Sequence, residues 1–178
     1  MVSNGYTTDF HSNTEIARKA EDITAELLEQ IYRDVDFKSV HDERECFYKG
    51  DIKGTNGKYY EVKDCSCIHR TGNVFTEYSK EWNNGTITDG WIKSCTGEYL
   101  CVLDRIDHNL YVLDLNKLKR IYKNYRRVKT NMGDNYTVGY CVPLRECRKQ
   151  GVLLYETPYF YCEEMDYHYI GKEYCSVI

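Results

Sequence analysis

Residues 50–63 read GDIKGTNGKYYEVK, and Asn56-Gly57 lies between two segments of alternating polar and apolar residues. Asn-Gly in this setting predicts a β-hairpin. A two-residue loop would put the side chains of Asp51 and Glu61 on opposite faces of the hairpin. A three-residue loop that ends at Gly57, with this glycine at positive φ, sets Asp51 opposite Glu61. The three-residue loop separates polar from apolar side chains better, and we therefore expect that register.

In this register, Asp51, Glu61 and Lys63 share the polar face of the hairpin. Neighbouring carboxylates repel each other unless a cation lies between them, and hard oxygen ligands are those that Mg²⁺ prefers. A nearby ammonium can orient a water molecule or neutralise developing negative charge. The alternative is a solvent-exposed face of cross-strand ion pairs. The other face is expected to pack on the core, and it comprises Tyr48, Gly50, Ile52, Tyr60 and Val62.

The composition restricts the class of protein. A chain of 178 residues fits a single domain with its own core. It contains no apolar run of the length that crosses a membrane, and its start has no apolar segment typical of a signal peptide, so we expect a cytoplasmic protein without membrane contact. The segment 156–178 holds five acidic residues and one lysine, which accounts for the whole net charge of −4. An acidic protein is a poor candidate for coating nucleic acid without specificity.

The chain has nine cysteines, an odd number that excludes a complete set of disulfides. In a reducing compartment we expect most of these thiols to be small buried apolar groups. Zinc binding is the alternative, by Cys65, Cys67 and His69 or by the pairs Cys95/Cys101 and Cys141/Cys147. None of these has the repeated close spacing of a structural zinc site, so we favour burial.

The spacing of apolar residues predicts a mixed sheet with helices packed on it, that is, an α/β fold. Residues 14–32 have the period of an amphipathic helix, and a second helix is expected from Asp114 or Asn116 to about 125, with one or two helical turns at 143–149. Strands are expected at 35–40, 46–53, 58–69, 73–78, 98–104, 110–115, 136–142 and 151–155, with a polar loop at 82–90.

Asp51, followed across a turn by Glu61-Val62-Lys63, resembles the signature of the PD-(D/E)xK nuclease superfamily. The proline that often precedes the aspartate is replaced by Gly50. Lys19-Ala20-Glu21 in the first helix is similar to the leading helix of the Holliday-junction-resolvase-like branch, in which a glutamate joins the metal site. The resemblance implies a restriction-endonuclease-like core that binds Mg²⁺ or Mn²⁺.

The same resemblance assigns roles to these residues. It implies that Asp51, Glu61 and the backbone carbonyl of Val62 bind the metal, that Lys63 acts on the attacking water or on the phosphate, and that Glu21 assists. Later segments are similar to small bacterial and phage members of the superfamily, namely 73–77, Gly90-Trp91, 98–104 and 110–119. Glu77 either reaches the site or ends a strand, and we favour the structural role. Trp91 either anchors the core or forms a platform on which bases stack, and we favour the core anchor.

The likeness covers about residues 13–155, so we expect a nuclease domain at 1–155 and an acidic, tyrosine-rich extension at 156–178 packed on it. The helix expected near 115–129 carries a run of cations without an acidic residue, which suggests contact with a phosphate backbone. These cations are Lys117, Lys119, Arg120, Lys123, Arg126, Arg127 and Lys129. The expected function is therefore metal-dependent hydrolysis of duplex or branched DNA, with a homodimer possible. The alternative is an inactive nuclease-fold protein of a phage or mobile element that engages a host protein through its tail.

Overall fold

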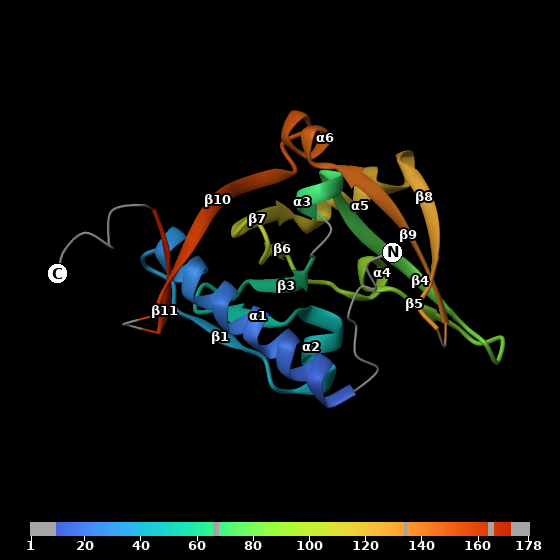
Figure 1. Cartoon of the computed structure of the whole chain (residues 1–178), viewed down its shortest axis with the longest axis horizontal. Helices are drawn as coiled ribbons and strands as arrows, with labels where there is room; N and C mark the ends of the chain where they lie inside the picture. The colour runs from blue at the N-terminus through green and yellow to red at the C-terminus, as the bar shows by residue number, and fades with distance from the viewer. Residues whose placement is uncertain (1–9, 66–67, 134, 164–165, 172–178) are drawn as a thin grey trace.

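Helices flank a curled mixed β-sheet in this protein, which forms a mixed α/β fold (Figure 1). The computed structural model describes residues 10–65, 68–133, 135–163 and 166–171. Seven strands form one sheet in the order β1-β2-β3-β6-β7-β10-β11, and four form a second in the order β5-β4-β9-β8. The predicted mixed sheet with flanking helices is thus confirmed.

In the seven-stranded sheet, β3 and β6 run parallel, and the other neighbours run antiparallel. The parallel pair lies next to the hairpin β2–β3, so this hairpin is part of the sheet and not an isolated ribbon. The strands are β1 (Phe37–Ser39), β2 (Ile52–Gly54), β3 (Tyr59–Asp64), β6 (Tyr99–Asp104), β7 (Asn109–Asp114), β10 (Leu153–Cys162) and β11 (Tyr167–Ile170).

The four-stranded sheet is antiparallel throughout and ends in the hairpin β4–β5, which points away from the larger sheet in Figure 1. Its strands are β4 (Asn73–Trp82), β5 (Ile87–Asp89), β8 (Arg126–Asn131) and β9 (Asn135–Pro143). The pairing of β4 with β9 shifts between Glu77 and Ser79, as at a β-bulge. The predicted loop at 82–90 is therefore partly wrong, because the chain continues as strand to Trp82 and returns in β5.

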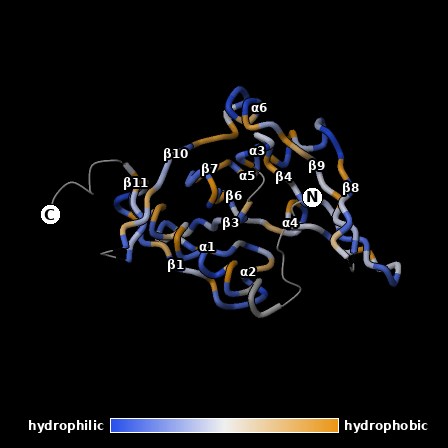
Figure 2. Tube along the Cα trace, in the orientation of Figure 1, coloured by the Kyte–Doolittle hydropathy of each residue, from blue (hydrophilic) through white to orange (hydrophobic). Residues whose placement is uncertain are grey.

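Helices cover both sides of the larger sheet. They are α1 (Phe10–Ile31), α2 (Glu43–Lys49), α3 (Ile68–Thr71), α4 (Trp91–Ser94), α5 (Leu115–Ile121), the 3-10 turn η1 (Tyr122–Asn124) and α6 (Leu144–Lys149). Leu27 and Leu28 of α1 are buried against Val62 and Leu103, in the core on one side of the sheet. A second core lies on the other side, where Leu118 of α5 is in the same cluster as residues from β6, β7, β4 and β9. Residues of β6 and β7 belong to both cores, and Figure 2 shows hydrophobic and hydrophilic residues mixed along these strands.

The hairpin at 50–63 has the predicted three-residue loop. Ile52 pairs with Tyr60 and Lys53 with Tyr59, which is the register expected from the separation of polar and apolar residues. The N–H of Gly54 donates to the carbonyl of Lys58 at 3.0 Å, and Gly57 has a φ of 77°. Ile52, Tyr60 and Val62 are buried, as predicted for the apolar face.

The prediction of a strand from residue 46 is wrong, because residues 43–49 form α2. Asp42 caps this helix by accepting from the N–H of Glu45 at 2.8 Å. The helix ends at Gly50, which has a φ of 139° and whose N–H donates to the carbonyl of Cys46. A Cβ at Gly50 would lie 2.9 Å from the backbone carbonyl of Tyr60, so glycine is required by both conformation and space. Tyr48 consequently faces solvent, with 56% of its surface exposed.

The helix expected near 115–129 also ends early. It begins at its predicted cap, where Asp114 accepts from the N–H of Lys117 at 2.9 Å, but residues 126–131 form strand β8. The reason is pairing over the full length of β8 with β9, which supplies backbone hydrogen bonds that a sequence pattern does not reveal.

The C-terminal part belongs to the main sheet. The boundary expected at 155/156 falls inside β10, whose first half pairs with β7 and whose second half pairs with β11. Strand β11 also contacts α1: Gln30 donates to the carbonyl of His168 at 2.8 Å and accepts from the N–H of Ile170 at 2.8 Å. Across the described residues, no helix has both the length and the apolar composition needed to cross a membrane.

Candidate functional site

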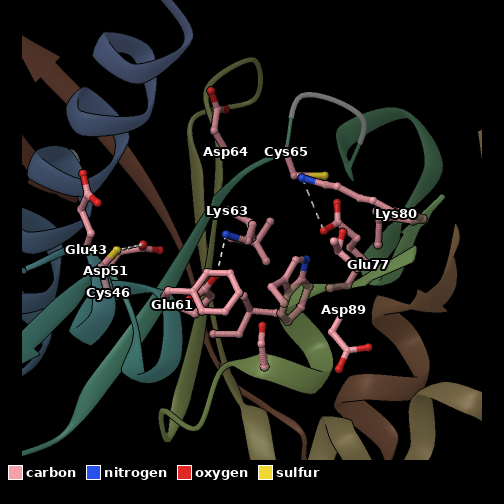
Figure 3. A pocket seen from close by; sticks show the side chains of 18 of the residues that line it. Glu43, Cys46, Asp51, Glu61, Lys63, Asp64, Cys65, Glu77, Lys80 and Asp89 are labelled. Atoms are coloured by element: carbon pink, nitrogen blue, oxygen red, sulfur yellow. Dashed lines mark hydrogen bonds and ion pairs between the residues drawn. The ribbon is translucent and has the colours of Figure 1, made fainter. Parts of the chain in front are cut away.

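Asp51 follows Gly50, the residue after α2, and is hydrogen-bonded to strand β3. Its Oδ2 accepts from the backbone N–H of Val62 at 2.7 Å, and its Oδ1 accepts from the thiol of Cys46 at 3.0 Å (Figure 3). The predicted juxtaposition with Glu61 follows, because Glu61 precedes Val62 on β3. The carboxylate is thus placed by two elements, helix α2 and strand β3.

Glu61 and Lys63 extend from β3 on the side that faces α4 and β4. The Glu61 side chain is 7% exposed, and its Oε1 lies 2.5 Å from Nζ of Lys63. The lysine side chain retains 36% exposure, and its ammonium lies 5.8 Å from the ring centroid of Trp91. Glu61 is therefore a buried carboxylate held by one ion pair, while its partner Lys63 remains open to a ligand.

The pKa of Glu61 and the pKa of Lys63 are both raised in the folded protein. Burial raises the pKa of Glu61, and Asp51 raises it further, against the opposing effect of Lys63. Burial alone would lower the pKa of Lys63, but Glu61, Asp51 and Glu77 outweigh it, and the net shift is upward. Lys63 therefore stays a cation through the physiological pH range.

Glu21 approaches the same group of residues from α1. Burial raises the pKa of Glu21 to about 7, and the charge of Asp51 adds to this effect, while Lys63 opposes it. Asp51, Glu61 and Lys63, which were expected to form the site, line one pocket, whereas Glu21 is not among the residues that line it.

Two cysteines at the site were not expected from the sequence. Cys46 donates its thiol hydrogen to Asp51, and burial, followed by this bond, raises the pKa of its thiol. Cys95 is fully buried, and burial together with Glu61 raises its pKa to about 12. Both thiols therefore stay protonated and act as weak hydrogen-bond donors, Cys46 to Asp51 and Cys95 to the backbone carbonyl of Lys49 at 3.4 Å. The spacing of residues in the sequence does not predict that Cys46 lies beside Asp51 or Cys95 beside Glu61. These contacts form because α2 and α4 pack against β3.

Asp51, Glu61, Lys63 and Cys46 line a pocket of about 840 Å³ between α2, β3, β4 and α4. Six carboxylates and two lysines contribute to its wall, so the formal charge is strongly negative. The acidic residues are Glu43, Asp51, Glu61, Asp64, Glu77 and Asp89, and the lysines are Lys63 and Lys80. Four aromatic residues also line it, namely Phe47, Phe75, Trp82 and Trp91. Glu77 lines this pocket and lies 3.8 Å from Lys80, whereas Trp91 both lines it and packs on the core as predicted.

Oxygen donors suited to a hard divalent ion are present, but they are engaged with other partners. Both oxygens of Asp51 accept hydrogen bonds, and Glu61 pairs with Lys63. Within the described part of the chain, no three side chains among His, Cys, Asp and Glu are grouped as an ion-binding set. Cys67, from the zinc alternative, lies outside the described residues. The chemical types of the donors fit Mg²⁺ or Mn²⁺. Burial is the main cause of the raised pKa of Glu21 and of Glu61, the charge of Asp51 adds to it, and a bound cation would oppose both effects.

The cations expected on one helix are divided among three elements. Lys119 is half-buried and donates to the carbonyl of Cys95, and Lys117 donates to that of Gly151 at 3.0 Å. Lys129 lies 2.5 Å from Glu81 on β4. The exposed remainder extends from α5 through η1 to β8 and comprises Arg120, Lys123, Arg126 and Arg127.

Comparison of the chain with models of known protein families found no match, and neither did comparisons with curated proteins and with solved structures. The chemistry of the site therefore has to be inferred from its own residues.

Proposed function

We propose that this protein is a metal-dependent endonuclease of restriction-endonuclease-like fold that hydrolyses DNA phosphodiester bonds in the cytoplasm. The observation that carries the proposal is the placement of Asp51, Glu61 and Lys63 on one wall of a pocket, with Glu21 within electrostatic reach. The hairpin β2–β3 beside the parallel strand β6, with α1 packed on the sheet, supports the fold assignment.

The charge of the pocket supports dependence on a divalent ion. A phosphodiester is an anion, and a wall of six carboxylates and two lysines would repel it in the absence of added cations. A divalent ion bound by Asp51, Glu61 and the Val62 carbonyl, with Glu21 nearby, would reduce the negative charge of the wall. When bound, such an ion supplies Lewis-acid stabilisation of the phosphate and its leaving oxygen.

The residues of the chain have separate tasks in this proposal. Asp51 and Glu61, which now contact the Cys46 thiol and the Lys63 ammonium, would hold the ion. The ammonium of Lys63 is then available to orient the attacking water or to stabilise the charge that develops on the phosphate. Exposed cations on α5, η1 and β8 would hold the backbone of the DNA outside the pocket.

One observation favours a second candidate function. The hydrogen bonds to both oxygens of Asp51 and the ion pair of Glu61 leave these carboxylates satisfied without any metal. A protein of this fold that binds a partner without hydrolysis would have the same arrangement.

A cleavage assay separates the two candidates. Supercoiled plasmid, linear duplex and a four-way junction are incubated with the pure protein and Mn²⁺, or with a chelator. We expect cleavage that requires the metal and is lost in Glu61→Gln. The matched control is Glu81→Gln, because Glu81 also pairs with a lysine but does not line the pocket. Cleavage retained by Glu61→Gln, or absent from the wild-type protein, would favour the binding protein.

A further inference from the structure

We propose that the pocket takes unpaired nucleotides, so that the substrate is single-stranded DNA or DNA opened at the cleavage point. This inference rests on the proposed nuclease function and specifies its substrate class. Its basis is the aromatic part of the pocket wall, which the hydrolytic roles of Asp51, Glu61 and Lys63 leave unexplained.

Two of the four aromatic rings present much of their surface to solvent. Phe47 on α2 is 56% exposed, and Trp82 at the end of β4 is 39% exposed. The indole N–H of Trp82 donates to the hydroxyl of Thr88 at 3.2 Å, and Thr88 lines the pocket as well. An exposed ring held in place by a hydrogen bond provides a flat surface against which a base can stack.

The inner rings are held by the backbone beneath them. Phe75 covers Gly139 of β9 so closely that a Cβ there would lie 2.4 Å from the ring. Trp91 packs against the core and lies beside Lys63. Aromatic side chains thus line the pocket from its exposed parts to the lysine proposed to act on the phosphate. Bases in a duplex remain stacked on one another, whereas unpaired bases can stack on such side chains.

The carboxylates of the pocket suit the edges of unpaired bases. Glu77 is 18% exposed, with Lys80 3.8 Å away, and it lies on the same wall as Phe75. Carboxylates accept hydrogen bonds from the N–H groups of bases, such as the amino group of cytosine. Watson–Crick pairing occupies those N–H groups in a duplex and leaves them available in a single strand.

Charge density favours the same substrate. A duplex carries one negative charge per about 1.7 Å of its axis, and a single strand about half of that density. Repulsion from the six carboxylates of the wall is therefore weaker for one strand than for two. Stacking and hydrogen bonds to bases offset this repulsion only where bases are unpaired.

Binding measured separately from cleavage tests the inference. Fluorescence anisotropy with Ca²⁺ compares a labelled 12-nucleotide single strand, its duplex and an abasic strand of equal charge. We expect the single strand to bind at least about tenfold more tightly than the other two, since stacking contributes substantially for each base. Trp82→Ala and Phe47→Ala should each weaken single-strand binding about tenfold, and Trp82→Phe should restore most of it.

Matched controls lie close to both residues. Tyr48 is exposed to the same extent as Phe47, at 56%, and contacts its ring, but it does not line the pocket. Tyr136 matches Trp82 in exposure, at 40% against 39%. It lies beside Lys129 and does not line the pocket. Tyr48→Ala and Tyr136→Ala should leave the affinity unchanged, and thermal unfolding of every variant shows whether the fold is retained.

The possible outcomes distinguish this inference from the proposed function. Equal affinity for single strand, duplex and abasic strand, unchanged in folded Trp82→Ala and Phe47→Ala, would overturn the inference, even if Mn²⁺-dependent cleavage is observed. Single-strand binding that depends on both rings, without cleavage of any DNA, would support the nucleotide pocket and remove the nuclease. Loss of affinity in Tyr48→Ala equal to that in Phe47→Ala would also overturn it.

Discussion

The carboxylate of Asp51 accepts a hydrogen bond from the backbone N–H of Val62 at 2.7 Å. This bond ties the residue that follows α2 to the central part of β3. Because Val62 lies between Glu61 and Lys63, the bond fixes the position of all three charged side chains relative to one another. The geometry of the site therefore depends on a backbone group as much as on the side chains themselves.

Asp51→Asn should preserve this bond while removing the charge. The amide oxygen can still accept from Val62, so we expect the free energy of unfolding to change by less than about 1 kcal/mol. Since Asp51 contributes to the raised pKa of Glu21, that pKa should fall from about 7 towards its ordinary value. NMR titration of the glutamate side chains measures it. Asp51→Leu leaves the Val62 N–H without its partner and should cost about 1–3 kcal/mol. An unchanged Glu21 pKa in Asp51→Asn would mean that the two carboxyls are not coupled.

Lys63→Met should lower the rate of cleavage far more than the affinity for DNA. The ammonium is proposed to act on the attacking water or the transition state, so its loss removes stabilisation that the ground state does not use. Single-turnover kinetics at saturating DNA measure this difference, with a loss of about 100-fold or more expected. Lys80→Met is the control, because Lys80 lines the same pocket with 40% exposure but pairs with Glu77. Similar rates in the two variants would exclude a special role for Lys63.

Glu21→Gln should change how stability depends on pH. The pKa of Glu21 is raised in the folded protein to about 7 from 4.5, so between these values the folded state holds a proton that the unfolded state has released. The contribution of Glu21 to stability is therefore full below pH 4.5 and is lost as the pH rises towards 7. Compared with the wild type, Glu21→Gln should lose less stability over this window, by about 1 kcal/mol after allowance for solvent screening.

Chemical denaturation at pH 4.5, 6 and 8 checks this expectation. Glu15→Gln is the control, because Glu15 lies on the same helix and is exposed. If the free energy of unfolding of the wild type and of Glu21→Gln changes equally between pH 4.5 and 7, the pKa of Glu21 is not raised in the folded protein.

Replacing Arg120, Lys123 and Arg127 by glutamine should weaken DNA binding to all sequences alike. These exposed side chains are proposed to contact phosphates, so the slope of log affinity against log salt should flatten by about 2–3. The rate of cleavage at saturating DNA should be retained. A control with equal charge loss replaces Arg33, Lys38 and Lys149, which are exposed on α1's end, β1 and α6. An equal effect of both triple variants would indicate a response to net charge alone.

Gln30→Ala should loosen the attachment of β11 to α1. The side-chain amide bonds the backbone at both His168 and Ile170, so we expect a loss of about 1–3 kcal/mol in the free energy of unfolding. Faster hydrogen exchange at 167–170 should accompany it. Gln150→Ala provides the comparison. Gln150 is exposed, and its side-chain amide donates to the hydroxyl of Tyr125. Unchanged exchange at β11 in Gln30→Ala would show that other contacts hold the strand.

Local patterns predicted the register of the β2–β3 hairpin correctly. The dipeptide Asn56-Gly57 and the alternation around it were sufficient for the hairpin register, because turn chemistry and side-chain period both act over a few residues. The same local signals were misread at α2. Asp42, with Glu45 three residues later, is a helix-start pattern, but the apolar alternation before Asp51 was extended too far back.

Long-range pairing explains what the sequence did not predict. β8 is a strand because β9 pairs with it, and the exposed cations at 126–129 gave no sign of this. The aromatic wall of the pocket brings Phe47 together with Trp82 and Trp91 from α2, β4 and α4, and no short segment encodes that arrangement. Both are consequences of tertiary structure that a pattern of local propensities does not contain.

The contact between Gln30 and His168 spans 138 residues of sequence. During translation, α1 leaves the ribosome well before the strand that fastens it, by which time Asp51, Glu61 and Lys63 have all been synthesised. Contacts this distant in sequence form late in folding, because the long intervening chain must first be ordered. The helix that carries Glu21 thus acquires its last support only when β11 is available, and nascent chains are expected to lack a fully assembled site until then.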